Sequence, residues 1–266
     1  MPNWVAHKVT VRGDSSLIST FINAIKGEDC AFDFNKIAPM PESLNMASGG
    51  ITDEAIVAYV TNNGECQLSD ELICWCKDCG VTNMFADDYI NKTFDRVKKM
   101  IKENGVDKKY SFASGGFGTE AEPMLTLYDA GKIYVENVNN YGCTTWYDWA
   151  RQNWGTKWQP SEVIVERDGD NGVYMEFSTA WSTPFPIFEK LSTMFPTLDV
   201  KVLFADEDIP CNCGMYAWEN GEFSEWVPER NKKGEFIDEE GAIRFACSVW
   251  DFDADEYLSE CELQMD

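Results

Sequence analysis

The sequence predicts an α+β fold: an antiparallel sheet in the ferredoxin-like (split βαβ) order, a long and mostly helical insertion, and an acidic C-terminal extension. Two observations support this prediction. Strand and helix periodicities appear near the N-terminus and again after residue 160, in the order strand, helix, hairpin, helix, strand. The residues between them have mainly helical spacing. We therefore assign 1–30 with 160–222 to the sheet core, 31–159 to the insertion and 223–266 to the extension.

The N-terminal segment alternates between two kinds of side chain, as a half-buried strand does. Val5, His7 and Val9 fall on one side, and polar residues fall mainly on the other. Asp14 follows as a helix cap, and apolar residues then recur at helical spacing until Gly27 ends the helix. This segment predicts the first strand and first helix of the core, with His7 as a buried imidazole.

The second set of core elements begins after residue 160. Strand periodicity over 163–165 and 173–177, with the turn 167–172 between them, predicts a hairpin. Pro184 opens a helix with one apolar stripe, and a last strand follows over 200–204. These elements complete the predicted sheet.

The insertion contains several amphipathic segments. Apolar spacing predicts helices over 53–59, 69–79 and 88–103, and a fourth that leads to Trp146. The 88–103 helix directs five basic side chains outward: Lys92, Arg96, Lys98, Lys99 and Lys102. This pattern is typical of the solvated face of a surface helix, which we favour over a phosphate-binding face.

Four tryptophans fall within thirteen residues: Trp146, Trp149, Trp154 and Trp158. Such a cluster is either the hub of a core or a stacking platform for a ligand. Trp146 and Trp149 are three apart, on one side of a helical turn, and Trp158 leads into the hairpin. We interpret the cluster chiefly as a joint between insertion and sheet. Binding of a nucleotide or a single-stranded nucleic acid remains the alternative role.

Ten cysteines occur in a chain that shows no export signal, so we expect them to be reduced and mostly buried. A zinc site is the alternative interpretation, with four candidate ligands: Cys74, Cys76, Cys79 and Cys213. Only Cys76 and Cys79 have the usual two-residue spacing, and Gly80 follows them as a helix stop. The pattern favours small core residues, and we predict neither a metal nor a cofactor.

The charge is strongly negative and unevenly distributed. The chain has 46 acidic and 22 basic residues, a net charge of −24, and eighteen of the acids lie beyond residue 200. The stretch 251–266 holds seven acids and no base. Such a field repels nucleic acid and attracts basic surfaces, so direct nucleic-acid binding is not expected.

Catalytic motifs are missing from the sequence. The single histidine, His7, is predicted to be buried, and the chain has no nucleophile elbow, no phosphate-binding loop and no HExxH zinc motif. We therefore predict that the protein is not an enzyme, and an unrecognised hydrolase is the third alternative.

Five short motifs follow one another over residues 2–184: Pro2–Trp4, Phe32–Pro41, Tyr141–Trp149, Asn153–Trp158 and Phe177–Pro184. Together and in this order they resemble the YubB-type ferredoxin-like domain family of plasmid and phage proteins. The resemblance implies a ferredoxin-like domain with a helical insertion, encoded on a mobile element and acting in a bacterial cytosol. It implies no chemistry. The region after Ile51 and the segment after Phe223 depart from the family pattern as additions.

These observations predict a non-enzymatic binding protein of the bacterial host cytosol. Its acidic surface is expected to engage a basic surface of a host protein, such as a nucleic-acid-binding defence protein, and to inhibit it by nucleic-acid mimicry. The predicted partner-binding carboxylates are Asp251, Asp253, Asp255, Glu256, Glu260 and Glu262. No membrane contact is expected, since no stretch approaches the roughly 18 apolar residues of a membrane span.

Overall fold

The computed structural model describes residues 2–82, 88–112 and 124–264. The chain forms two compact units. The sheet unit consists of Met1–Pro39 and Ala150–Asp266, and the helical unit of Met40–Trp149. The prediction placed the two boundaries after residues 30 and 159. Each unit is described by itself.

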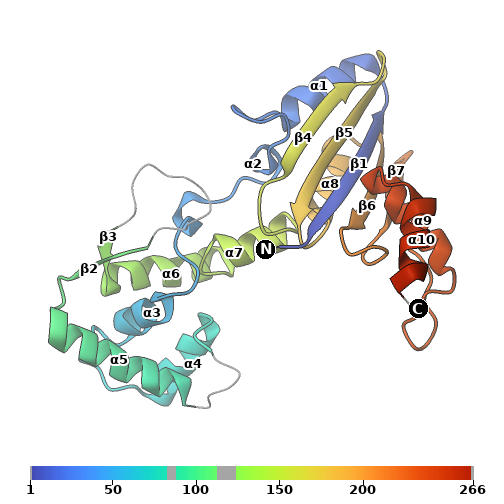
Figure 1. Ribbon diagram of the computed structural model, residues 1–266. Helices are drawn as coiled ribbons and strands as arrows, with labels where there is room; N and C mark the ends of the chain where they lie inside the picture. Colours follow the sequence, from blue (N-terminus) through green and yellow to red (C-terminus); the bar gives the residue numbers. More distant parts are fainter. Residues whose placement is uncertain (1, 83–87, 113–123, 265–266) are drawn as a thin grey trace. The chain divides into compact units, whose positions relative to one another are not determined.

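The sheet unit contains one antiparallel sheet of six strands (Figure 1). The strands lie across the sheet in the order β4 (Ser161–Arg167), β5 (Gly172–Ala180), β1 (Trp4–Arg12), β6 (Asp199–Asp206), β7 (Gly214–Glu219) and β8 (Glu222–Trp226). The first four strands, with a helix after β1 and another after β5, have the ferredoxin-like order, which confirms the predicted fold class. Strands β7 and β8 extend this sheet beyond β6.

Three helices cover one face of the sheet: α1 (Ser15–Ile25), α2 (Phe34–Ile37) and α8 (Phe185–Met194). The face is apolar because β1 alternates as predicted, and Val9 lies between Met175 of β5 and Val202 of β6. The Asp14 carboxylate caps α1 by accepting a hydrogen bond from the Ser16 amide. The predicted hairpin is confirmed as β4 and β5.

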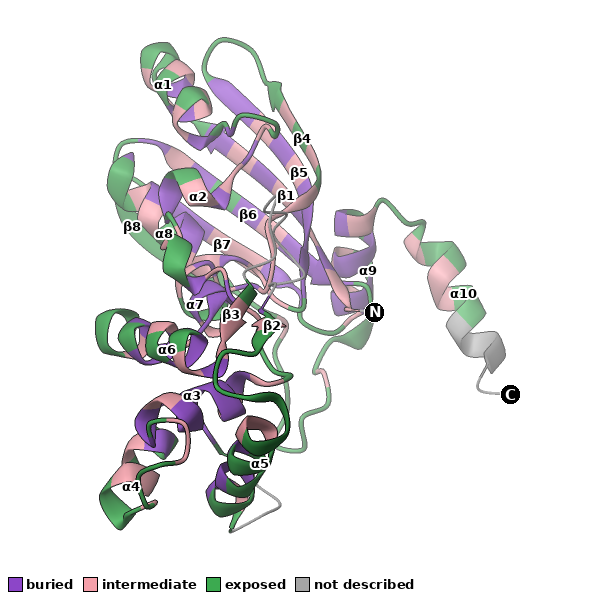
Figure 2. Ribbon diagram, turned by 90° about the vertical axis from the view of Figure 1, so that its left-hand side faces the viewer, coloured by how far each residue is buried: buried purple, intermediate pink, exposed green. Residues whose placement is uncertain are grey.

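Aromatic rings fill the layer between these helices and the sheet. Phe32 packs against Phe177 and Phe188 with ring centroids 5.2 and 6.5 Å apart, and Phe188 also stacks on Trp218. Because Phe32 and Phe34 are fully buried here, residues 31–39 belong to the sheet unit. Figure 2 shows buried positions concentrated in the central strands, whereas exposed and intermediate residues prevail in α10.

The opposite face of the sheet is covered in part by α9 (Glu239–Trp250), which is followed by α10 (Ala254–Gln264). Ala205 of β6 forms a small core with Ile243, Ala246 and Cys247 of α9, and Ala6 of β1 packs against it. The predicted C-terminal extension thus begins in the sheet with β8 and continues in a helix that packs against β6 and β1.

The helical unit contains four longer helices and shorter elements. In chain order these are η1 (Glu42–Leu44), α3 (Thr52–Val60), α4 (Asp70–Asp78), α5 (Tyr89–Asn104), β2 (Lys109–Ser111), β3 (Met124–Thr126), α6 (Leu127–Tyr141) and α7 (Trp146–Asn153). Helices α3 to α6 confirm the four predicted helices. The strands β2 and β3 pair with each other and were not predicted.

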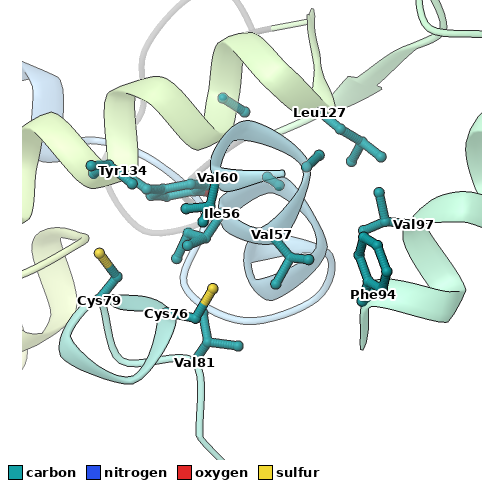
Figure 3. Close-up of a cluster of buried hydrophobic side chains, with 14 of the residues drawn as sticks. Ile56, Val57, Val60, Cys76, Cys79, Val81, Phe94, Val97, Leu127 and Tyr134 are labelled. Atoms are coloured by element: carbon teal, nitrogen blue, oxygen red, sulfur yellow. The ribbon is translucent and has the colours of Figure 1, made fainter. Parts of the chain in front are cut away.

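The core of the helical unit is built around α3, in which five of nine residues are apolar and buried. Figure 3 shows Ile56, Val57 and Val60 of α3 near Tyr134 of α6 and Phe94 of α5. Helices α3 and α6 approach closely because Gly131 has no side chain where α6 meets the Ala55 carbonyl. Helix α7 runs across the boundary between the units, which falls after Trp149.

Candidate partner-binding surface

The acidic C-terminal surface is positioned by α9. Asp238 caps this helix by accepting a hydrogen bond from the Gly241 amide at 2.9 Å, and successive turns bury Ala242, Ile243 and Ala246. The helix ends at Trp250, and its C-cap residue Asp251 adopts a left-handed conformation with φ 57°. Because Asp251 also pairs with Lys8 of β1, the connection from α9 to α10 is attached to the sheet.

Helix α10 begins with another carboxylate cap. The Asp253 Oδ1 atom accepts hydrogen bonds from the amides of Asp255 and Glu256, at 2.9 and 3.1 Å. Tyr257 and Leu258 pack against the small core of α9 and β6. This apolar contact orients the remaining faces of α10 toward solvent.

Five of the six predicted partner-binding carboxylates are exposed: Asp251, Asp253, Asp255, Glu256 and Glu260. The Glu262 side chain lies outside the described residues. Three of the five make contacts within the fold: Asp251 pairs with Lys8, Asp253 caps α10, and Asp255 pairs with Arg244 at 2.8 Å. Glu256 and Glu260, one helical turn apart, lack such a pairing within the described part of the chain. The structure thus separates exposed carboxylates that have a partner within the fold from exposed carboxylates for which it shows no side-chain partner among the described residues.

A cavity of about 620 Å³ lies between α9, α10 and the β6–β7 loop. Its apolar lining includes Ile209, Ile243 and Leu258. Glu239 and Glu240 add carboxylates from the first turn of α9, and Arg244 bridges Glu240 and Asp255 at 2.8 Å each. The sequence prediction missed these α9 residues, although the Glu240–Arg244 spacing of four residues is a helical ion-pair signal.

The four clustered tryptophans are not equally accessible. Trp146, Trp149 and Trp154 are buried, at 6%, 7% and 0% exposure, and only Trp158 is half-buried. The Trp154 Nε1 atom donates to the Ala38 carbonyl oxygen at 2.9 Å, which fixes its ring beside Phe34. Burial of three rings leaves little face for a stacked base, so the geometry favours core packing over the alternative ligand-binding role.

The cysteines of the zinc hypothesis lie in different surroundings. Cys74 is exposed, Cys76 and Cys79 lie among apolar side chains of the helical unit (Figure 3), and Cys213 is buried in the sheet unit. Burial raises the pKa of the Cys76 thiol to about 12, which opposes the thiolate that zinc requires. Over residues 2–82, 88–112 and 124–264, no three His, Cys, Asp or Glu side chains are arranged to hold a metal ion.

His7 is a core residue, as predicted. Its ring is 1% exposed and stacks on Phe177 with centroids 4.7 Å apart. Burial lowers the pKa of the imidazole to about 3, so the ring is neutral at physiological pH. In the sheet, His7 lies opposite Phe177 of β5 on one side and opposite Phe204 of β6 on the other.

The basic residues of α5 face solvent, as predicted. Arg96 nevertheless reaches back to the buried Glu54 of α3 at 2.6 Å, while the Tyr89 hydroxyl donates to Asp53 at 2.7 Å. Burial raises the pKa of Asp53 despite that hydrogen bond. These contacts hold α5 against α3, so both the Arg96–Glu54 pair and the Tyr89–Asp53 pair have a structural role.

The fold defines a ferredoxin-like α+β protein whose helical region lies ahead of the matched ferredoxin-like domain in the sequence. Residues 153–246 match the family described as the ferredoxin-like domain in Api92-like protein, a range that includes most of α9. The chain is also similar to the crystal structure of protein Api92 from Yersinia pseudotuberculosis, with 12% identity and a TM-score of 0.40. That similarity covers 87% of this chain and 100% of the other. Comparison with curated proteins gives no match.

None of the helices in the described part of the chain combines the length and apolar character needed to cross a membrane.

Proposed function

We propose that the protein is a non-enzymatic binding protein whose acidic surface engages a basic surface of a host protein. The resemblance to the YubB-type family of plasmid and phage proteins supports a bacterial host and a gene carried on a mobile element. A partner that normally binds nucleic acid, such as a defence protein, offers the basic groove that rows of carboxylates can occupy.

The observation that carries the proposal is the exposed face of α10. Glu256 and Glu260 project from a helix that Asp253 caps and Arg244 ties to α9. A fixed helix presents charge without the entropy cost of ordering a flexible tail. The sheet unit as a whole has 29 Asp and Glu against 13 Lys and Arg, so the surrounding field has the same sign.

The internal contacts decide which substitutions test the proposal. Replacing all six predicted carboxylates would also remove the pairs of Asp251 with Lys8 and of Asp255 with Arg244, and would loosen α10. The double variant Glu256→Gln, Glu260→Gln removes two charges and leaves these pairs intact. A matched control is Glu166→Gln, Glu189→Gln, because both residues are exposed in the same unit but lie on β4 and α8.

The test is capture of partners from bacterial lysate on the immobilised full chain. A specific partner should bind at low salt and elute as the Debye length falls from about 10 Å at 0.1 M to about 3 Å at 1 M. The α10 variant should weaken binding about fivefold, from roughly 0.5 kcal/mol for each lost charge pair, and the control should not. Equal binding by wild type and the α10 variant would exclude this surface.

A further inference from the structure

A second feature of the sheet unit lies beside the last turn of α9, on the side of the sheet away from α1 and α8. Two cavities of about 230 and 270 Å³ adjoin there, since Glu162, Ser178 and Trp250 line both. We call them together the tryptophan groove. Its chemistry comes from six side chains: Trp4, Trp250, Glu162, Glu176, Glu207 and Asp251.

The groove already holds one cation from the chain itself. The Lys8 ammonium donates to the Ser248 carbonyl oxygen at 2.9 Å and pairs with Asp251. The carbonyl end of α9, which carries the negative end of the helix dipole, therefore faces this region. Lys8 compensates one of the four carboxylates and leaves the groove with a formal excess of three negative charges.

Two of the carboxylates, Glu162 and Glu207, line the larger of the two cavities, and both are exposed. Glu162 lies at an irregularity in the pairing of β4 with β5 and has a left-handed backbone, with φ 54°. A bulge of this kind redirects a side chain relative to its strand, and here the redirected residue lines both cavities.

Two indole rings form the walls. The Trp250 Nε1 atom donates to the Asp206 carbonyl oxygen at 3.1 Å, and the Trp4 ring packs against Trp158 with centroids 6.3 Å apart. These contacts hold both rings in place. Indole faces provide no ligand for a metal ion, but they attract a planar organic cation through their quadrupole.

We propose that the tryptophan groove binds an arginine side chain of a basic partner segment. A guanidinium stacks on an indole face while its N–H groups donate to Glu162 and Glu207, a combination that a lysine ammonium matches less well. The inference rests on the proposed function and specifies the residue type that the partner contributes. It places a second contact point on the sheet unit, separate from the exposed face of α10.

The test uses the full chain with ¹⁵N-labelled tryptophan and three peptides of alternating glycine with arginine, lysine or citrulline. Citrulline has nearly the shape of arginine without its charge. The indole signals of Trp4 and Trp250, assigned with Trp4→Phe and Trp250→Phe, should shift with the arginine peptide. The citrulline peptide should bind about tenfold more weakly than the arginine peptide, because it loses both the ion pair and the stacked cation. The lysine peptide keeps its charge, so its affinity should fall less.

The matched variants separate the groove from the general field. Glu162→Gln with Glu207→Gln should weaken arginine binding about tenfold, whereas the Glu166→Gln, Glu189→Gln control should change it less than about twofold. Equal affinity for citrulline, unchanged binding by the groove variant, or shifts confined to other indoles would overturn the inference. Those results leave the proposed function intact, because capture through Glu256 and Glu260 is measured separately.

Discussion

Replacement of Gly131 by alanine tests the packing at the centre of the helical unit. A Cβ atom at this position would stand 1.9 Å from the Ala55 carbonyl oxygen and 2.8 Å from the Tyr59 Cβ atom. A carbon and a carbonyl oxygen normally stay about 3.3 Å apart, so α3 and α6 would have to separate by roughly 1.4 Å. The obstacle is backbone, which cannot rotate away as a side chain can.

Two opposing effects set the size of the change. Overpacking costs about 1–3 kcal/mol, and the upper end applies because a helix must move. Alanine has a helix propensity about 1 kcal/mol better than glycine, which offsets part of that cost. We expect a net loss of about 2 kcal/mol in the free energy of unfolding.

Urea unfolding followed by far-UV circular dichroism measures this loss. The matched control is Asn139→Ala, an exposed position in the same helix, which should change stability by less than about 0.5 kcal/mol. If Gly131→Ala proved as stable as wild type, the close approach of α3 and α6 would be refuted.

Three further predictions concern buried groups. The pKa of His7 is lowered from 6.5 to about 3, so the stabilising contribution of its neutral ring is present above pH 6.5 and is lost as the pH falls. Between pH 7 and 5.5, the free energy of unfolding in urea should fall by about 1 kcal/mol more for wild type than for His7→Leu. Equal losses in the two proteins would contradict a buried neutral imidazole. Trp154→Phe removes the indole N–H that donates to the Ala38 carbonyl oxygen, and should lower the free energy of unfolding by about 2 kcal/mol. An unchanged midpoint of urea unfolding would exclude that hydrogen bond. A thiol reagent at pH 8 should modify the exposed Cys66 and Cys74 well before Cys76, because burial raises the pKa of the Cys76 thiol. Peptide mapping measures the labelling of each cysteine, and equal labelling of all three would contradict the burial of Cys76.

Local periodicity was sufficient to predict the sheet core. The alternation through Val5, Val9 and Val11 depends only on which side of a strand is buried, and the structure confirms it. The turn after Arg167 likewise specified the hairpin from adjacent residues. These features are encoded within a few neighbouring positions, so one sequence is enough to recognise them.

Long-range contacts were not predictable in the same way. Phe32 and Phe34 alternate like any short apolar segment, and only the structure shows them packed against rings contributed by β5, α8 and the region after α7. The acidic stretch posed a similar problem. Composition marked Asp251 to Glu260 as one negative segment, but it could not distinguish Asp253, which caps a helix, from Glu256, which faces solvent. Such roles depend on the fold around each carboxylate.

We propose that exposed carboxylates on α10 bind a basic host protein. The most direct measurement of this binding is capture from bacterial lysate by wild type, by Glu256→Gln with Glu260→Gln, and by the Glu166→Gln, Glu189→Gln control, at low and high salt. We expect a salt-sensitive partner, which the α10 variant binds about fivefold more weakly than wild type and the control binds as tightly as wild type. A partner that is bound equally by all three proteins, or whose binding does not change with salt, would contradict it.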